Sequence, residues 1–369
     1  KLEMDEAMLR FPHLMEQVLQ KLDNNGLIKS REAARSWQEF IDAQKYPWLR
    51  IVNIPTILNL VNPYAMTNSY MNLAAKRGQI EVFKVILNSE TDNNSETVDC
   101  SKSLHLACCY GCVKIVEMLL TKSDDLKVDL SRKTTAMGNT AFHSACIGGS
   151  SEILELIMKN SQKLKINLNE MNRLDLKTGF VYACQLGHIE IVAMIMKNSK
   201  SMNIELNTSD CYNRNAFHYA CQSNHLEIAK IIMEEFTRLK FDLNAKDKSG
   251  FTAFHTACRM GSMSIINMML DHSEFDLLLK TQIGTNGFHL ACLNGRTNIV
   301  EILINKSEST DLAVTAKNNW GCTGFHLACS AGQTNVVELL IHKSEYLKLD
   351  LTAEDDQGRT GFQLAKHHR

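Results

Sequence analysis

The chain has 369 residues, of which 44% are apolar and 22% are charged, and its formal net charge is −1. This composition is normal for a folded protein, and a net charge near zero argues against a sequence-independent nucleic-acid binder. The longest apolar runs, such as residues 191–196, fall far short of the ~20 residues that span a bilayer. Because the N-terminus also lacks an apolar signal-peptide core, we expect a cytoplasmic or nuclear protein with no membrane or nucleic-acid partner.

Residues 9–50 are predicted to form three short helices. Pro12 suits the first turn of a helix, and Leu14, Val18 and Leu22 form an apolar stripe at four-residue spacing. Residues 23–26 read Asp-Asn-Asn-Gly and are expected to end this helix. Two further amphipathic stretches follow, whose apolar residues are Leu27, Ile28, Ala33, Ala34, Trp37, Phe40 and Ile41.

The prolines mark a change along the chain, because all four of them lie within the first 63 residues. Such a shift in composition indicates a domain boundary, which we place near residues 62–68. The predicted organisation is therefore a helical domain at 9–50, a linker at 51–66 and a repeat array at 67–369.

Self-similarity at a fixed period dominates the sequence after this boundary. Residues 140–146 read Thr-Ala-Phe-His-Ser-Ala-Cys, and close copies occur at 215–221, 252–258, 286–292 and 323–329, with weaker copies at 69–75, 102–108, 178–184 and 360–366. The recurring cysteines are 38, 38, 37, 37, 34 and 37 residues apart; they are Cys108, Cys146, Cys184, Cys221, Cys258, Cys292 and Cys329. Equivalent positions in stacked helices lie ~8–10 Å apart, too far for disulfides, so we expect reduced core thiols.

Each copy of the motif opens a unit of two helices. A short polar break follows the motif, and then an apolar stretch such as residues 189–196, in which apolar positions recur with the period of one buried helix face. Turn residues link successive units, for example Asp-Lys-Ser-Gly at 247–250 and Asn-Asn-Trp-Gly at 318–321. One unit is thus a turn, a short helix, a tight loop and a second helix.

This unit resembles the ankyrin repeat, whose hallmark is Thr-Pro-Leu-His-x-Ala. Here Ala or Gly replaces the Pro, Phe usually replaces the Leu, and the period exceeds the ~33 residues of the family because the loop after the second helix is longer. The resemblance implies an all-α ankyrin-repeat solenoid of about eight full repeats plus a partial C-terminal one. It also implies a binding protein, with a protein target held on a concave strip of turn tips and first helices.

The positions that follow the His and the Cys of each motif are expected to face that strip. They include Ser144, Tyr182, Tyr219, Thr256 and Leu290 after the His, and Arg259 and Leu293 after the Cys. Tyr, Trp and Arg most often carry binding energy. The predicted partner-binding residues are therefore Trp320, Tyr182, Tyr219, Tyr212, Arg259 and Arg214. Trp320→Ala is predicted to weaken partner binding with little change in thermal stability, unless Trp320 packs on the next turn.

The segment at 9–50 resembles an F-box, the three-helix module of ubiquitin-ligase substrate receptors. The positions that fall in the register of that family are Phe-Pro at 11–12, Leu14, Val18, Leu-Asp at 22–23, Leu27, Ala34 and Trp37. Two residue types depart from it, since Phe11 stands for Leu and Ala34 for Val. The resemblance implies that Pro12, Leu14, Val18, Leu22 and Leu27 dock the Skp adaptor and, through it, a cullin scaffold. The alternative is that these helices cap the repeat stack and that the protein is a plain ankyrin scaffold.

The sequence contains no catalytic or cofactor-binding motif. The recurring His-x-x-Cys pairs two metal-capable side chains, but a structural zinc site needs four ligands, so we expect core histidines that hydrogen-bond to the backbone of neighbouring turns. Cys108, Cys109 and Cys112 are interpreted as core or surface thiols. We therefore predict that the protein is not an enzyme and that it uses no metal or cofactor.

Overall fold

The computed structural model describes residues 71–91, 100–123, 132–134, 136–239, 241–310 and 313–366. The chain divides into two units, Lys1–Asn167 and Leu168–Arg369. The predicted helical domain at 9–50 and linker at 51–66, with Pro12, Leu14, Val18, Leu22 and Leu27, lie outside the described residues.

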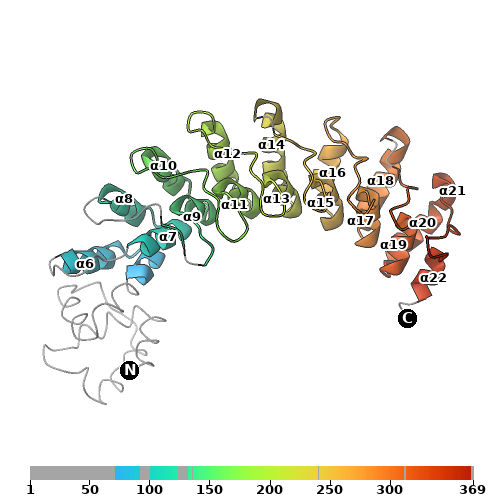
Figure 1. The fold of residues 1–369 in the computed structure, drawn as a ribbon, viewed down its shortest axis with the longest axis horizontal. Coiled ribbons are helices and arrows are strands. Elements are labelled where there is room, and N and C mark those ends of the chain that lie inside the picture. Colours follow the sequence, from blue (N-terminus) through green and yellow to red (C-terminus); the bar gives the residue numbers. More distant parts are fainter. Residues whose placement is uncertain are drawn as a thin grey trace, which may run out of the picture. The chain divides into compact units, whose positions relative to one another are not determined.

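The first unit consists of paired helices within its described part (Figure 1). A helix over residues 71–77 precedes α6 (Ile80–Thr91), and the following pairs are α7 (Ser101–Cys109) with α8 (Val113–Thr121) and α9 (Ala141–Gly148) with α10 (Ser151–Asn160). The first helix of one pair packs on the first helix of the next, since α7 contacts α9. The second helices pack in the same way, since α8 contacts both α6 and α10.

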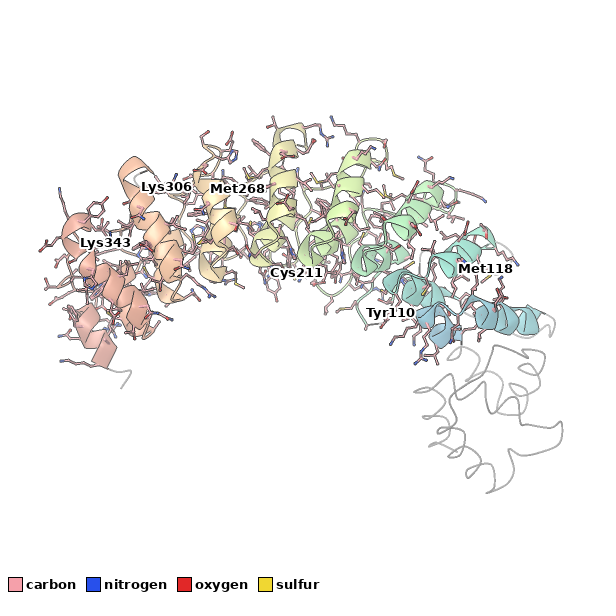
Figure 2. The ribbon with its side chains drawn as sticks, turned by 180° about the vertical axis from the view of Figure 1, so that it is seen from behind. Tyr110, Met118, Cys211, Met268, Lys306 and Lys343 are labelled. Carbon is pink, nitrogen blue, oxygen red and sulfur yellow. The ribbon has the colours of Figure 1, made fainter. Side chains whose placement is uncertain are left out.

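The second unit repeats this arrangement. Its helix pairs are α11 (Gly179–Leu186) with α12 (Ile189–Asn198), α13 (Ala216–Gln222) with α14 (Leu226–Leu239), α15 (Ala253–Met260) with α16 (Met263–Leu270), α17 (Gly287–Leu293) with α18 (Thr297–Thr310), and α19 (Gly324–Ser330) with α20 (Thr334–His342). The short helices α21 (Ser344–Leu347) and α22 (Gly361–Ala365) end it. First helices contact first helices and second helices contact second helices, so the unit has two layers (Figures 1 and 2). The predicted two-helix repeat is confirmed.

A reciprocal cap begins the first helix of most repeats. In α15, the Thr252 side chain accepts a hydrogen bond from the His255 N–H, and Nδ1 of His255 accepts one from the Thr252 N–H at 3.2 Å. Equivalent caps begin α9, α13, α17, α19 and α22, with Thr or Asn at the N-cap. The motif His is thus the third helical residue and satisfies a donor that the helix leaves unpaired.

Two of these histidines also reach the next repeat. Nε2 of His218 lies 3.1 Å from the Phe251 carbonyl oxygen, and Nε2 of His289 lies 3.2 Å from that of Cys322. The prediction of core histidines bound to neighbouring turns is therefore confirmed at these positions. At α22, Gln363 takes the place of the His in this cap, since its Oε1 accepts a hydrogen bond from the Thr360 N–H at 2.8 Å, and its side chain is exposed.

Adjacent turns of the second unit are joined by single backbone hydrogen bonds. The N–H of Lys248 donates to the Tyr212 carbonyl at 2.9 Å, and that of Asp356 donates to the Trp320 carbonyl at 3.1 Å. The same bond joins Cys211 to Asp175, Gln282 to Ser249 and Asn319 to Ile283. The turn tips therefore form a continuous row joined by backbone bonds. Side chains add links at some turns, since Gln282 Nε2 donates to the Lys248 carbonyl and Asn319 Nδ2 donates to the Gln282 carbonyl.

The recurring cysteines occupy the core. All seven are buried, and burial raises the pKa of thiols such as those of Cys146 and Cys258 far above the usual range. A neutral, inaccessible thiol neither attacks disulfides nor binds metal readily. No helix in the described segments is both long and apolar enough to cross a bilayer.

The close approach of α9 to α7 predicts a strong steric effect at Gly148. A Cβ at this position would lie 2.8 Å from the Cys109 carbonyl oxygen and closer still to that of Cys108, and both oxygens belong to rigid backbone. Gly148→Ala is expected to lower the free energy of unfolding by about 3 kcal/mol or more, measured by urea denaturation. Gly111→Ala is the control: a Cβ there meets nothing within 4 Å, so only its left-handed backbone (φ +73°) costs about 1 kcal/mol. Equal losses in the two variants would contradict the steric explanation.

Candidate functional site

The predicted partner-binding residues differ in exposure. Tyr212 and Trp320, in two of the turns, are 58% and 54% exposed. Tyr182, Arg214 and Arg259 are half-buried. Tyr219 is only 2% exposed, so the expectation that it faces solvent is wrong. Its hydroxyl donates a 2.7 Å hydrogen bond to Oδ2 of Asp210, a buried acceptor that allows the whole ring to enter the interior.

The same correction applies to other positions after the motif His. Ser144, Thr256 and Leu290 are also buried. The physical reason is that the short first helices pack closely against the first helices of the neighbouring repeats. Exposed side chains are found about one helical turn later, at Met260 and Leu293 near the ends of their helices.

Five of the side chains in this region alternate in a cation–aromatic ladder. Nζ of Lys177 lies 5.3 Å from the Tyr182 ring centroid and 4.5 Å from that of Tyr219. The guanidinium carbon of Arg214 lies 4.8 Å from the Tyr219 centroid and 5.0 Å from that of Tyr212. The ladder therefore runs Tyr182, Lys177, Tyr219, Arg214, Tyr212. Each such contact contributes on the order of 1 kcal/mol, and more where it is desolvated.

Carboxylates hold the two cations of the ladder in place. Lys177 pairs with Asp175 at 2.9 Å, and Arg214 pairs with Asp210 at 2.8 Å. Burial alone would raise the pKa of Asp210, but hydrogen bonds from the Arg214 N–H, the Tyr219 hydroxyl and the Arg214 side chain outweigh it and lower that pKa. Burial, reinforced by Asp175, raises the pKa of Tyr182 to about 12. The ladder therefore combines the neutral hydroxyl of Tyr182 with cations that are each paired to a carboxylate.

Sequence reasoning found the tyrosines and Arg214 but missed Lys177, Asp175 and Asp210. A signal was present, because an Asp four residues before an Arg recurs at Asp210–Arg214 and Asp355–Arg359 at the same place in the turn. Asp210 and Asp355 also accept backbone N–H bonds from the residues two and four positions later. The recurrence therefore marks a turn whose acid fixes both the loop and a basic side chain.

Three of the exposed apolar residues of the turn row lie at equivalent positions. Tyr212, Ile283 and Trp320 each occupy the third position of their turn and are 58%, 41% and 54% exposed. Arg259 adds a cation beside this row, with its guanidinium 5.2 Å from the Phe251 ring centroid. Exposed aromatic and aliphatic side chains next to Arg are typical of protein interfaces.

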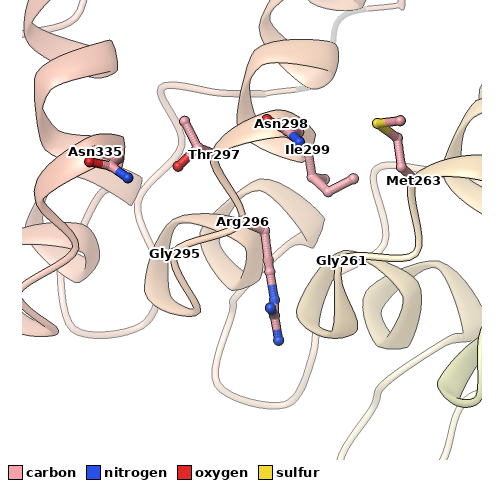
Figure 3. A pocket seen from close by; sticks show the side chains of 8 residues that line it. All are labelled: Gly261, Met263, Gly295, Arg296, Thr297, Asn298, Ile299 and Asn335. Carbon is pink, nitrogen blue, oxygen red and sulfur yellow. The ribbon is translucent and has the colours of Figure 1, made fainter.

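A shallow pocket of about 370 Å³ lies where the second helices α16 and α18 begin (Figure 3). Arg296 runs along one side of it and donates from Nε to the Arg259 carbonyl at 3.0 Å. The pocket is lined by Gly261, Met263, Gly295, Arg296, Thr297, Asn298, Ile299 and Asn335. It is open and mostly polar, which suits a peptide side chain better than an enclosed cofactor.

The described residues contain no cluster of three or more His, Cys, Asp or Glu side chains placed to hold a metal ion. The cysteines nearest to such a pattern are Cys108, which is buried, and Cys109 and Cys112, which are half-buried. Burial is the main cause that raises the pKa of all three thiols. They are thus neutral thiols with little tendency to bind metal.

Comparisons with known proteins identify the repeat. A family model described as ankyrin repeats (3 copies) matches residues 71–170, 163–247, 232–313 and 275–355. Among solved structures, the crystal structure of the ankyrin repeat domain of Bcl-3, described as a unique member of the IkappaB protein family, aligns with a TM-score of 0.51 at 19% identity, covering 62% of this chain and 94% of that one. No curated protein matches the chain. The Bcl-3 likeness shows a shared fold.

Proposed function

The chain belongs to the ankyrin-repeat family, and we propose that this protein–protein interaction module is the substrate-recognition subunit of a cullin-based ubiquitin ligase. The repeats would capture the target protein, and residues 9–50 would dock the Skp adaptor. The chain itself would transfer nothing, which fits the non-enzymatic ankyrin-repeat scaffold. The reduced cysteines suit a cytosolic or nuclear compartment.

The observation that carries target binding is the row of turns in the second unit. Tyr212 and Trp320 are large aromatic residues, more than half exposed, and neither has a core to fill. Folding gives little reason to keep Trp320 at a turn tip, whereas binding does, because aromatic anchors dominate interface energies. Tyr212 ends the cation–aromatic ladder, a preorganised patch whose cations are already fixed and lose little freedom on binding.

Support for adaptor docking comes from the sequence at 9–50. Pro12, Leu14, Val18, Leu22 and Leu27 follow the F-box register, and an apolar stripe at four-residue spacing is suited to docking a helical partner. The competing function is an ankyrin scaffold with no ligase link, in which these helices cap the stack. That alternative is favoured by the family match, which begins at residue 71 and leaves 9–50 without an assigned family.

Adaptor binding by the full chain separates the two functions. We expect purified chain to bind purified Skp adaptor with a Kd of about 1 μM or tighter, and Leu22→Asp to weaken binding by roughly 100-fold, because it places a carboxylate in an apolar contact. The measurement is isothermal titration calorimetry, with circular dichroism to verify that the variant is folded. Trp320→Ala is the control and should leave adaptor binding unchanged. If the wild-type chain does not bind, the scaffold function replaces the receptor.

A further inference from the structure

Charge is segregated between the two sides of residues 241–330, which run from the loop before α15 to the end of α19. Between residues 241 and 330, the turns, the first helices and the loops that lead out of them carry six cations and the single carboxylate of Asp247. The cations are Lys246, Lys248, Arg259, Lys280, Arg296 and Lys317, and we call them the basic strip. The second helices and the loops after them instead carry Asp242, Asp271, Glu274, Asp276 and Glu301, with Lys306 as a cation. Figure 2 shows the two sides, with Cys211 at the turn edge of the unit and Met268 and Lys306 at the opposite edge.

The basic strip differs from the cation–aromatic ladder in having no carboxylate partners. Lys177 and Arg214 of the ladder are paired with Asp175 and Asp210. By contrast, none of the six strip cations forms an ion pair with a carboxylate in the part of the chain that the structure describes. Within 241–330, the described pair of a lysine with a carboxylate joins Lys306 to Asp271, on the side of the second helices, where His272 also lies 3.8 Å from Glu274.

The contacts that the strip cations make leave their charge available. Arg296 Nε and Lys317 Nζ each donate to a backbone carbonyl, of Arg259 and Glu354 respectively, at 3.0 Å. Arg259 lies on the Phe251 ring. The one carboxylate among them, Asp247, accepts the Ser249 and Phe251 N–H groups and so stabilises its own turn. The strip therefore holds more positive charge than its single carboxylate offsets, on a protein whose net charge is −1. At its end, Lys317 also acts on the carboxyl of Asp350, whose pKa is lowered by hydrogen bonds from Thr352 and, in addition, by this lysine.

Apolar side chains are interleaved with these charges. Ile283 and Trp320 are exposed in the turns that follow Lys280 and Lys317. Met260 and Leu293 are exposed at the ends of α15 and α17. A surface for nucleic acid would combine its cations with stacking platforms or a deep groove. Here aliphatic residues outnumber the single Trp, which favours a polypeptide with apolar side chains of its own.

The spacing of the strip fits an extended chain. Lys246, Lys280 and Lys317 each stand directly before their turn, and the turns are joined tip to tip by the Gln282–Ser249 and Asn319–Ile283 backbone bonds. Adjacent helix pairs pack about 8–10 Å apart, and three residues of extended chain cover about 10 Å. One carboxylate in every three residues would therefore meet one lysine in every turn.

We propose that the basic strip binds an extended acidic segment of the partner, with carboxylates about three residues apart and aliphatic or aromatic side chains between them. This inference rests on the proposed function as a protein-capturing module and specifies the chemistry of what is captured. The strip ends at the turn of residues 354–359, where Glu354, Asp355 and Asp356 stand against the single Arg359. That acidic turn would repel the segment and so limits its length to the three basic repeats.

The test uses the full chain and three labelled probes in fluorescence anisotropy. The first is a twelve-residue peptide with Asp at every third position and Leu or Gly between; the second has Lys in place of each Asp; the third is a twelve-nucleotide single-stranded oligothymidine. We expect the Asp peptide to bind at least tenfold more tightly than either other probe. Its binding should weaken on raising the salt from 50 to 300 mM, as ionic contacts do.

Charge reversal locates the site. The double variant Lys280→Glu, Lys317→Glu is expected to weaken binding of the Asp peptide at least tenfold. The control double variant Lys306→Glu, Lys343→Glu makes the same change of net charge away from the strip and should change this binding less than twofold. Trp320→Ala should weaken binding as well, with an unchanged Tm. Equal effects of the two double variants, or tighter binding of the oligonucleotide through the same lysines, would overturn the proposal.

Adaptor binding by the full chain is measured in parallel, so that the two proposals can fail separately. If the chain binds the adaptor but not the Asp peptide, only the acidic-segment inference fails. If it binds the Asp peptide but not the adaptor, only the ligase function fails.

Discussion

Replacing Asp210 with alanine is expected to lower the free energy of unfolding by about 3–5 kcal/mol, because it leaves a buried network without its acceptor. The Asp210 side chain is fully buried, and its two oxygens accept from the backbone N–H groups of Tyr212 and Arg214, from the Arg214 guanidinium and from the Tyr219 hydroxyl. Removing it strands the Arg214 charge and the Tyr219 hydroxyl next to apolar surroundings. The measurement is urea denaturation of the full chain, monitored by circular dichroism.

Asp355→Ala provides the matched control for this prediction. Asp355 stabilises an equivalent turn and forms an equivalent ion pair, with Arg359 at 2.8 Å. In the described residues, however, its carboxylate oxygens accept no hydrogen bond from a tyrosine hydroxyl. Its arginine is also more exposed, 46% against 27% for Arg214, so water replaces the lost partner more easily. We expect a loss about half as large. If the two variants lose equal stability, the Tyr219 hydroxyl contributes nothing to the free energy of unfolding, and Asp210 stabilises only its own turn.

The second large effect is acid destabilisation through the capping histidines. Burial lowers the pKa of His255 and of His289 to about 4, and it also lowers the pKa of His218. In the unfolded chain these groups have a pKa of about 6.5, so the unfolded state takes up protons first. Their contribution to stability is therefore complete above about pH 6.5 and is lost as the pH falls to 4. The loss is about 3 kcal/mol at pH 4 for each of His255 and His289.

The chain itself offers a non-titrating replacement for this experiment. Gln363 forms the same reciprocal cap with Thr360 that His255 forms with Thr252. We expect His255→Gln to be somewhat less stable than wild type at pH 7.5 but to lose less stability between pH 6.5 and 4. Urea denaturation at four pH values within this range measures both slopes. Parallel slopes for wild type and variant would mean that His255 is already protonated, or already exposed, in the folded chain.

The repeat was predictable from the sequence because its signals are local and recur. The Phe-His-x-Ala-Cys core, the N-cap three residues before the His and the Gly-containing turns each depend on residues close in sequence. Agreement of capping, periodicity and turn chemistry at each copy is what specifies a fold. The role of the His as a cap partner follows from the same spacing, since it stands at the third helical residue behind a Thr or Asn.

The candidate site was less predictable because its contacts cross repeats. Lys177 meets Tyr219 across more than forty residues, and nothing in the spacing of either residue indicates the contact. Tyr219 occupies the same motif position as Tyr182, yet one is buried and the other half-buried. The difference depends on which acid lies beside each hydroxyl: the buried Asp210 at 2.7 Å for Tyr219, and the partly exposed Asp175 at 3.5 Å for Tyr182. Such a distinction depends on the three-dimensional structure and cannot be made from the spacing of residues in the sequence.

The backbone bonds between the turn tips have a consequence for how binding specificity evolves in this chain. Since each bond uses an N–H and a carbonyl, the identity of the side chain at the third turn position does not affect it: Tyr212, Ser249, Ile283, Trp320 and Gln357 all occupy this position. Apart from Tyr212, whose ring contacts Arg214, these residues can therefore be exchanged almost independently of folding. A new partner can be acquired one turn at a time, with each intermediate sequence still able to fold.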